Sequence, residues 1–212
     1  MRNLLNKELK LTISPLFYVM PLLMGLLMFI PNWLYFMVLM YFFFISVPNI
    51  LAGCKSQNDL SFSVLLPVNK DDIVKARILS FSLVEMLHIA VSALLAAVNM
   101  WIYGDAVFFL SPNMAFFGLG FVMYGLFNLA LFPIYYKTAY KYGAAVIVSI
   151  SLAFIFAAGA ELIALFNRDI NSFMRNYSPG HWLVLLLGIL FYILSNYIAY
   201  VLSVKAFRKV EA

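Results

Sequence analysis

Two carboxylates stand inside long apolar stretches of this 212-residue chain, where an ionised group would be costly. Glu85 lies in the run 78–103 and Glu161 in the run 143–166. A charge at the centre of a bilayer costs about 2.5–3.5 kcal/mol on insertion scales, so such residues usually face a partner, water or a pathway. His88 follows Glu85 by three residues, which places both side chains on one helical face. We predict a local hydrogen bond between Glu85 and His88, with a role in a substrate path or in subunit pairing as the alternative.

The Glu-x-x-His spacing also occurs on helices that hold carboxylate-bridged metal ions. Those sites need further carboxylates from neighbouring helices, and Glu161 is expected nearer the opposite face of the membrane from Glu85. The chain also lacks the G-x-x-x-x-G-K-[ST], H-E-x-x-H and G-x-S-x-G patterns of phosphate binding, zinc binding and nucleophilic catalysis. We therefore predict no metal ion, no cofactor and no enzyme activity in this chain.

Asparagines also stand within apolar runs, and amide groups in lipid usually form hydrogen bonds across helices. We expect this of Asn99, Asn128 and Asn196. Small residues that let helices approach closely occur at Gly118, Gly120, Gly125 and 157–160. Candidates for lining a translocation path or for pairing subunits are Glu85, His88, Asn99, Asn128 and Glu161.

Six apolar runs must position these side chains, and each is near or above the roughly 18 residues that cross a bilayer as a helix. The composition is 65% hydrophobic and 11% charged, far more apolar than a soluble domain. The sequence therefore predicts an all-α integral membrane protein with a single domain, 1–212. The expected spans are 13–30, 33–51, 78–103, 114–136, 143–166 and 182–204. Pro48 predicts a kink in the second span, with Asn49 placed to satisfy the freed backbone groups.

The positive charges alternate between the gaps. All but Arg168 and Arg175 of the 14 Lys and Arg residues lie in the two tails or in the gaps after the second and fourth runs. The positive-inside rule then places both termini in the cytoplasm. The net charge of +5 is explained by this topology and by an anionic inner leaflet, so no nucleic-acid partner is expected.

Two polar segments on the cytoplasmic side have helical patterns of their own. Residues 1–12 predict a short amphipathic helix on the membrane surface, with a frayed tail as the alternative. In the segment 53–77, Asp59 or Asn58 can cap a short apolar helix that stops before Pro67. Asn69 can cap a second helix that continues into the third span. The short helix either lies flat on lipid or docks into a groove of another protein.

The residues of this segment also resemble a known family. The run 61–79, SFSVLLPVNKDDIVKARIL, is similar to the stretch before the third span in small bacterial permease subunits of the type-2 ATP-binding-cassette exporter family. Residues 66–77 match that family's phrase LP-V-x-[KR]-x-[DE]-I-V-x-[AG]-[KR]. The likeness in architecture covers nearly the whole chain, and the specific motif covers these dozen residues.

The resemblance implies a half-transporter in a bacterial plasma membrane. Two such subunits, identical or paired with a sister, would bind two separate cytoplasmic ATPase subunits, which hold the ATP and Mg²⁺. The resemblance assigns ATPase coupling to the short helix, at Asp59, Leu60, Phe62, Val64, Leu65 and Leu66. It also implies export of an amphipathic or hydrophobic peptide, such as a modulin-like toxin or a bacteriocin.

Two other functions compete with this hypothesis. An ion-coupled secondary transporter could use Glu85 or Glu161, although the sequence contains no visible inverted repeat. A scaffold or immunity protein that binds partners without transporting anything would share the same topology. Transport driven by ion gradients, or ATPase binding without substrate-stimulated hydrolysis, would distinguish the two.

Overall fold

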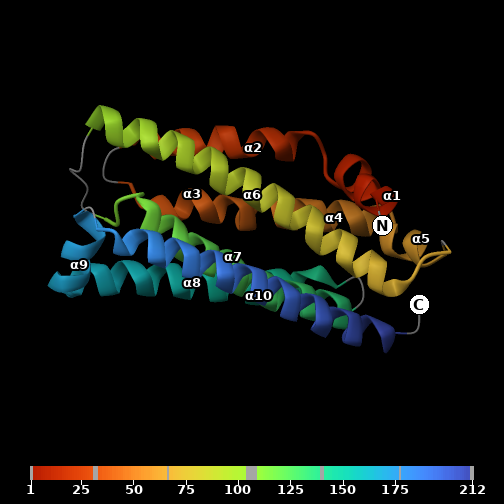
Figure 1. Ribbon diagram of the computed structural model, residues 1–212. Helices are drawn as coiled ribbons and strands as arrows, with labels where there is room; N and C mark the ends of the chain where they lie inside the picture. The colour runs from red at the N-terminus through yellow and green to blue at the C-terminus, as the bar shows by residue number, and fades with distance from the viewer. Residues whose placement is uncertain are drawn as a thin grey trace.

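The computed structural model describes residues 2–30, 33–65, 67–103, 109–138, 141–176 and 178–210, without the side chains of Leu60, Ser61 and Tyr103. Every regular element within these ranges is a helix (Figure 1). In the N-terminal half these are α1 (Arg2–Lys7), η1 (Glu8–Thr12), α2 (Leu16–Gly25), η2 (Leu26–Phe29), α3 (Tyr35–Tyr41), η3 (Phe42–Ser46), α4 (Val47–Ser56) and α5 (Asp59–Leu65). They are followed by α6 (Lys70–Tyr103), α7 (Met114–Lys137), α8 (Tyr142–Phe166), α9 (Arg168–Arg175) and α10 (Gly180–Arg208). The all-α prediction is confirmed.

Among the described residues, five helical stretches are long and apolar enough to cross a membrane: Tyr35–Ser56, Lys70–Ile102, Met114–Lys137, Tyr142–Phe166 and Gly180–Arg208. A sixth candidate is the bent pair Arg2–Thr12 and Leu16–Phe29, whose two parts meet at 67°. The expected first span is thus shorter than the run 13–30, because Ile13 is extended and Pro15 precedes α2. At 1.5 Å per residue, Leu16–Phe29 extends roughly 21 Å, less than a typical hydrocarbon core.

The second span is irregular just before Pro48, where the sequence predicted a kink. The π-helical turn η3 ends at Ser46, immediately before the segment with Pro48. Asn49 Nδ2 donates to the carbonyl of Ile45 at 2.6 Å, one turn back. This carbonyl lies four residues before Asn49 itself, whereas the missing N–H of Pro48 leaves the Phe44 carbonyl without its partner, so the contact is not the predicted one.

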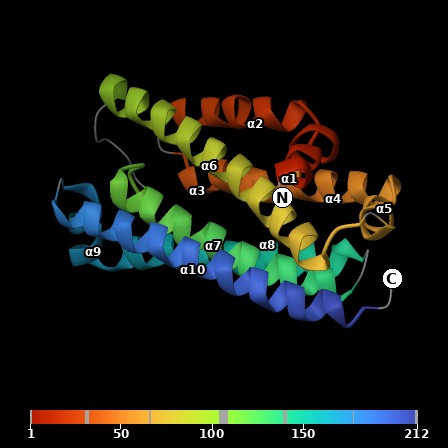
Figure 2. The same ribbon diagram turned by 45° about the vertical axis from the view of Figure 1, so that its right-hand side comes forward.

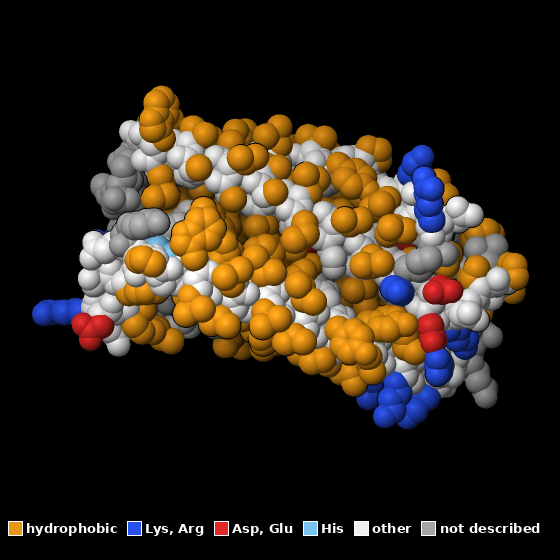
Figure 3. Space-filling model, viewed as in Figure 1, with side chains coloured by type: hydrophobic (Ala, Val, Ile, Leu, Met, Phe, Trp, Pro, Cys, Tyr) orange, Lys and Arg blue, Asp and Glu red, His pale blue; other side chains and the backbone are white. Residues whose placement is uncertain are grey.

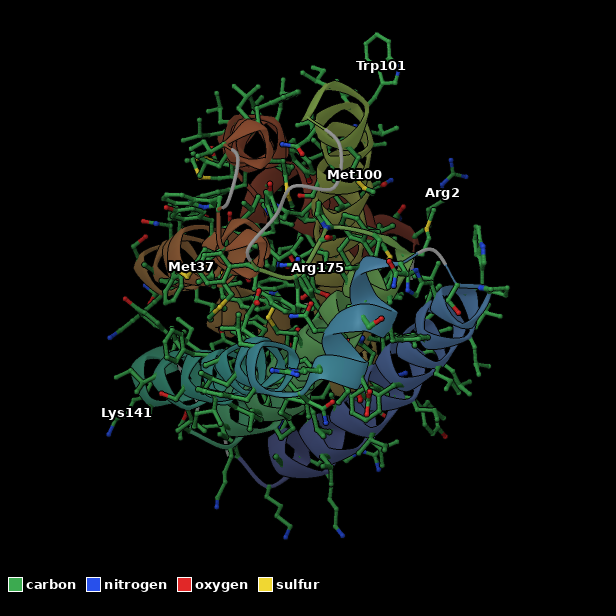
Figure 4. All side chains as sticks on the ribbon, turned by 90° about the vertical axis from the view of Figure 1, so that its left-hand side faces the viewer. Arg2, Met37, Met100, Trp101, Lys141 and Arg175 are labelled. Carbon is green, nitrogen blue, oxygen red and sulfur yellow. The ribbon has the colours of Figure 1, made fainter. Side chains whose placement is uncertain are left out.

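Both chain ends, α1 and α5 lie at one end of the bundle, and α9 lies at the other (Figures 1 and 2). Figure 3 shows a long apolar face between these ends, with Lys and Arg gathered mainly at the end that carries the termini. At the α9 end, Trp101 is 86% exposed and projects away from the bundle (Figure 4). An apolar belt between two polar ends is the shape of a bilayer-spanning bundle.

Glycines set the closest helix contact, between α7 and α10. A Cβ on Gly188 would lie 2.1 Å from the carbonyl oxygen of Gly118, and a Cβ on Gly118 would lie 2.6 Å from the carbonyl oxygen of Val184. Gly125 faces Phe191 and Ser195 of the same helix. The predicted close approach is confirmed here. Gly159, in the small-residue stretch of α8, faces open space instead.

The segment before the third span has two helices, as predicted. α5 ends at Leu65, ahead of Pro67, and α6 begins directly after Asn69 and continues for 34 residues. Asn58, at a φ of 49°, carries the chain from α4 into α5, and its carbonyl accepts from Phe62 N at 3.0 Å. Asn58 is therefore the cap residue of α5, because its carbonyl accepts the first hydrogen bond of that helix. Asparagine also tolerates the left-handed backbone found there.

The loop between α8 and α10 contains the short helix α9. Asn167 Oδ1 accepts from the backbone N–H groups of Asp169 and Ile170, at 3.0 and 3.2 Å. This cap satisfies two of the donors that begin every helix. α9 lies at the end of the bundle opposite the termini, beside α8 and α10 (Figure 1).

Candidate functional site

A fully buried arginine organises the end of the bundle that carries the termini. Arg77 lies in the second turn of α6, and its side chain has no exposed surface. Its Nε lies 2.6 Å from Glu8 Oε2, and its Nη2 donates to Glu8 Oε1 at 3.1 Å. The same guanidinium pairs with Asp59 and donates from Nη1 to Cys54 Sγ at 3.2 Å. One side chain thus joins η1, α4, α5 and α6.

Lys7 completes this charge cluster, which we define as Lys7, Glu8, Asp59 and Arg77. Its ammonium pairs with Asp59 and donates to Ser63 Oγ at 2.7 Å. Two cations therefore meet two carboxylates. Charges removed from water are stable when paired and hydrogen-bonded, so the cluster holds the N-terminal helix and α5 against the start of α6.

The charge cluster changes the pKa of Asp59. Burial would raise the pKa of this carboxyl, but the Arg77 guanidinium and the Lys7 ammonium outweigh burial and lower its pKa below the ordinary value. Asp59 is consequently ionised at neutral pH. Its carboxylate pairs with Lys7 and Arg77 of the bundle.

The charge cluster orients α5. Asp59 and Ser63 are one turn apart and are 8% and 1% exposed, so this side of the helix faces the protein. Phe62 and Leu65 lie on the other side and are 58% and 84% exposed. We call Phe62 and Leu65 the apolar tip of α5. Val64 packs on the core as a half-buried residue.

The predicted coupling residues are thus divided between two faces. Asp59 holds the helix, Phe62 and Leu65 are displayed, and Val64 lies between the two groups. Leu66 and the side chain of Leu60 lie outside the described residues. Sequence reasoning missed the role of Arg77 and counted it as a topology signal. Its position between Ala76 and Ile78, next to buried Ile73 and Val74, was the available sign of burial.

A second polar cluster joins three membrane helices. Glu85 Oε2 on α6 accepts from Asn128 Nδ2 on α7 at 2.8 Å and from the Tyr192 hydroxyl on α10 at 2.5 Å. Asn128 Nδ2 also donates to Asn196 Oδ1 at 3.1 Å. We call these four residues the membrane cluster. The expected bonding of Asn128 and Asn196 across helices is confirmed.

The predicted hydrogen bond between Glu85 and His88 is wrong. His88 Nε2 instead lies 2.9 Å from the carbonyl oxygen of Val38 on α3. Glu85 and His88 share a face of α6, but that face lies between different neighbours, and each side chain bonds to the helix beside it. A single-helix pattern cannot reveal which neighbouring helix supplies the partner.

The remaining candidates occupy separate places. Asn99 Nδ2 donates to the carbonyl of Met28 in η2, where the first span ends in a 3₁₀ turn. Glu161 Oε2 accepts from Leu110 N at 3.2 Å near α9, at the opposite end from the charge cluster. The five membrane candidates therefore do not form one site. Within the described residues, no group of three or more His, Cys, Asp or Glu side chains could hold a metal ion.

These features define a multi-pass helical membrane protein with a charge-held helix at one end. A family model described as "ABC-2 family transporter protein" matches residues 3–208, nearly the whole chain. The chain belongs to this family and is a membrane subunit of an ABC transporter. Searches of curated proteins and of solved structures found no match.

Proposed function

We propose that this chain is the permease subunit of an ATP-driven exporter and that the apolar tip of α5 docks into a separate cytoplasmic ATPase. The observation that carries the proposal is the contrast between the two faces of α5. One face is held by buried ion pairs, and the other displays Phe62 and Leu65. A short amphipathic helix held rigidly in this way suits a groove on a partner protein.

The charge cluster gives this docking a mechanical consequence. Asp59 connects α5 to Arg77 on α6. Glu85 lies on the same helix, about two turns after Arg77. A displacement of α5 by the ATPase would reach α6 through the ion pairs and then α7 and α10 through the membrane cluster. In this proposal ATP and Mg²⁺ are held by the partner, and this chain supplies the path.

The experiment is co-purification in detergent of the tagged chain with an ATPase subunit recognised by its nucleotide-binding motif. The double variant Phe62→Asp, Leu65→Asp should lose the ATPase, because two carboxylates would be buried in an apolar groove. The control is Phe166→Asp, Ile170→Asp, a matched change of exposed apolar residues at the opposite end. Retention of the ATPase by the α5 variant, or its loss from the control as well, would contradict the docking role.

We further propose that two permease subunits, identical or sister chains, enclose the path and that the cargo is an amphipathic or hydrophobic peptide. The support is the family membership and the apolar surface between the charged ends (Figure 3). Such a peptide should stimulate ATP hydrolysis by the reconstituted complex in a bacterial-type membrane. A soluble polar peptide of equal length should not.

The buried carboxylates of Glu85 and Glu161 are the observation that favours an ion-coupled transporter as a second candidate. Each is bonded to uncharged donors, and the membrane cluster contains no Lys or Arg. Proteoliposomes distinguish the two functions. Uptake or release driven by a proton gradient without nucleotide would support the second candidate, and dependence on ATP would support the first.

A further inference from the structure

A groove runs between α6 and α10 on the face seen in Figure 3. Its volume is about 400 Å³. On α6 the lining includes Ile78, Leu79 and Ser82, and on α10 it includes Ile193 and Tyr197. Volumes of roughly 300–1,000 Å³ are those of ligand sites for small molecules.

The floor of the groove offers little hydrogen bonding. Tyr192 and Asn196 also line it, but the Tyr192 hydroxyl donates to Glu85 and Asn196 Oδ1 accepts from Asn128. Asn196 Nδ2 donates to the Tyr192 carbonyl at 3.0 Å. Because these polar atoms are used inside the bundle, the groove presents mainly carbon and suits a hydrocarbon chain.

The groove becomes cationic toward the end that carries the termini. Lys75 lines it there, and Tyr200 is shared with a second depression of about 520 Å³ that Lys205 and Lys209 also line. All three lysines are exposed. None makes an ion pair with a described residue. Asp71, which lines the second depression, is already paired with Arg208, whose Nε donates to it at 3.0 Å.

We propose that this groove binds one anionic phospholipid, with an acyl chain along α6 and α10 and its headgroup against Lys75, Lys205 and Lys209. Charge complementarity selects this occupant, because basic pockets between membrane helices on the cytoplasmic side attract anionic headgroups. Size disfavours a peptide helix, since one helical turn, ~10–12 Å wide, fills roughly 400–600 Å³. The groove would hold about one such turn.

The site goes beyond the transport function and does not depend on the ATPase. Its chain end touches Tyr192 and Asn196 of the membrane cluster, and its headgroup end touches α10 beside Asp71 of α6. A bound lipid would therefore fill the space between the two helices that the membrane cluster and the Asp71–Arg208 pair connect.

The test is lipid titration of the intact chain in detergent, with bound lipid counted by native mass spectrometry. Phosphatidylglycerol and phosphatidylcholine with identical acyl chains are the two probes. We expect one phosphatidylglycerol to bind at least tenfold more tightly than phosphatidylcholine. The variant Lys75→Gln, Lys205→Gln, Lys209→Gln should abolish that preference and leave phosphatidylcholine binding unchanged.

The matched control is Lys10→Gln, Lys55→Gln, Lys141→Gln, which removes the same charge from exposed lysines outside the groove. It should keep the preference. A second variant, Ile193→Trp, should fill the groove and reduce binding of both lipids, with unfolding temperature as the check on folding.

Four results would overturn the proposal. The first is equal binding of the two lipids by the native chain, and the second is an equal loss of the preference in the control. The third is normal lipid binding by the Ile193→Trp variant. The last is the finding that no lipid binds in the groove because a second copy of the chain or an amphipathic peptide occupies it.

Discussion

Arg77 shows how a single side chain can define a site. A guanidinium presents a planar fork of donors, which allows it to meet Glu8, Asp59 and Cys54 at once. Lysine has one compact charge and could not reach all three. The residue therefore acts as the fixed point to which the surface helices are attached.

Replacing Arg77 by Met should strongly destabilise the chain. The change leaves Glu8 and Asp59 with Lys7 as their one remaining cation in the charge cluster, and breaking a buried pair costs about 3–5 kcal/mol. Thermal unfolding in detergent measures the effect. Arg208→Met is the control, because the Arg208–Asp71 pair is exposed and its loss should leave stability nearly unchanged. Equal effects of the two variants would contradict the account.

Asp59 predicts an acid limit for the charge cluster. Its folded pKa lies below its unfolded value, so its contribution to stability is complete above the unfolded pKa, near 4, and is lost as the pH falls through the folded value. Thermal stability measured from pH 6 downward should therefore begin to decrease once the pH is below about 4. The variant Asp59→Asn should be less stable at pH 6, and its stability should depend less on pH below about 4. An unchanged acid slope in the variant would contradict the pairing.

Glu85 predicts a contrast between two substitutions. Gln keeps an oxygen that can accept from Asn128 and Tyr192, whereas Ala leaves the Tyr192 hydroxyl and one N–H of Asn128 without an acceptor, at about 1–3 kcal/mol each. Glu85→Gln should therefore unfold near the native temperature, and Glu85→Ala well below it. Transport that survives Glu85→Gln would also argue against proton coupling at this residue. Equal destabilisation by both changes would contradict a role based on acceptance.

At the scale of elements, small residues and polar pairs do different work. Gly118 and Gly188 bring α7 and α10 into backbone contact, and the membrane cluster then connects this pair to α6. Within a bilayer, where lipid is as apolar as leucine, close packing and hydrogen bonds drive helix association. These two features therefore hold the central helices together.

Gly188→Ala should separate α7 from α10. The added Cβ would lie 2.1 Å from the Gly118 oxygen, which is backbone and cannot rotate away. We expect the free energy of unfolding to decrease by about 1–3 kcal/mol or more, as at other overpacked sites. Gly159→Ala is the matched control, because nothing lies within 4 Å of its new Cβ and alanine favours helix. Measured unfolding that ranks these variants in the opposite order would contradict the packing.

For the whole molecule, much of the fold could be predicted from residue type and spacing. Apolar length predicted the spans, Pro67 and Asn69 marked the boundary between α5 and α6, and Pro48 marked the irregular second span. These are local properties. The chain breaks the expected first span at Pro15, another local feature whose effect the apolar run concealed.

The partners of buried polar groups could not be predicted in the same way. Nothing in the spacing of Glu85 and His88 says that one faces α10 and the other α3. Likewise, Arg77 and Glu8 are far apart in sequence, and a tertiary contact brings them together. Periodicity predicts which face of a helix is polar, whereas only the packed bundle shows what that face meets.

We propose that the end carrying α5 and both termini faces the cytoplasm, because docking to a cytoplasmic ATPase requires this orientation. The direct measurement is labelling of single cysteines by a membrane-impermeant maleimide in intact cells, in a Cys54→Ala background. Leu65→Cys on α5 should react only after the cells are permeabilised, whereas Ile170→Cys on α9 should react in intact cells. Labelling of position 65 from outside intact cells would invert the topology and contradict ATPase docking.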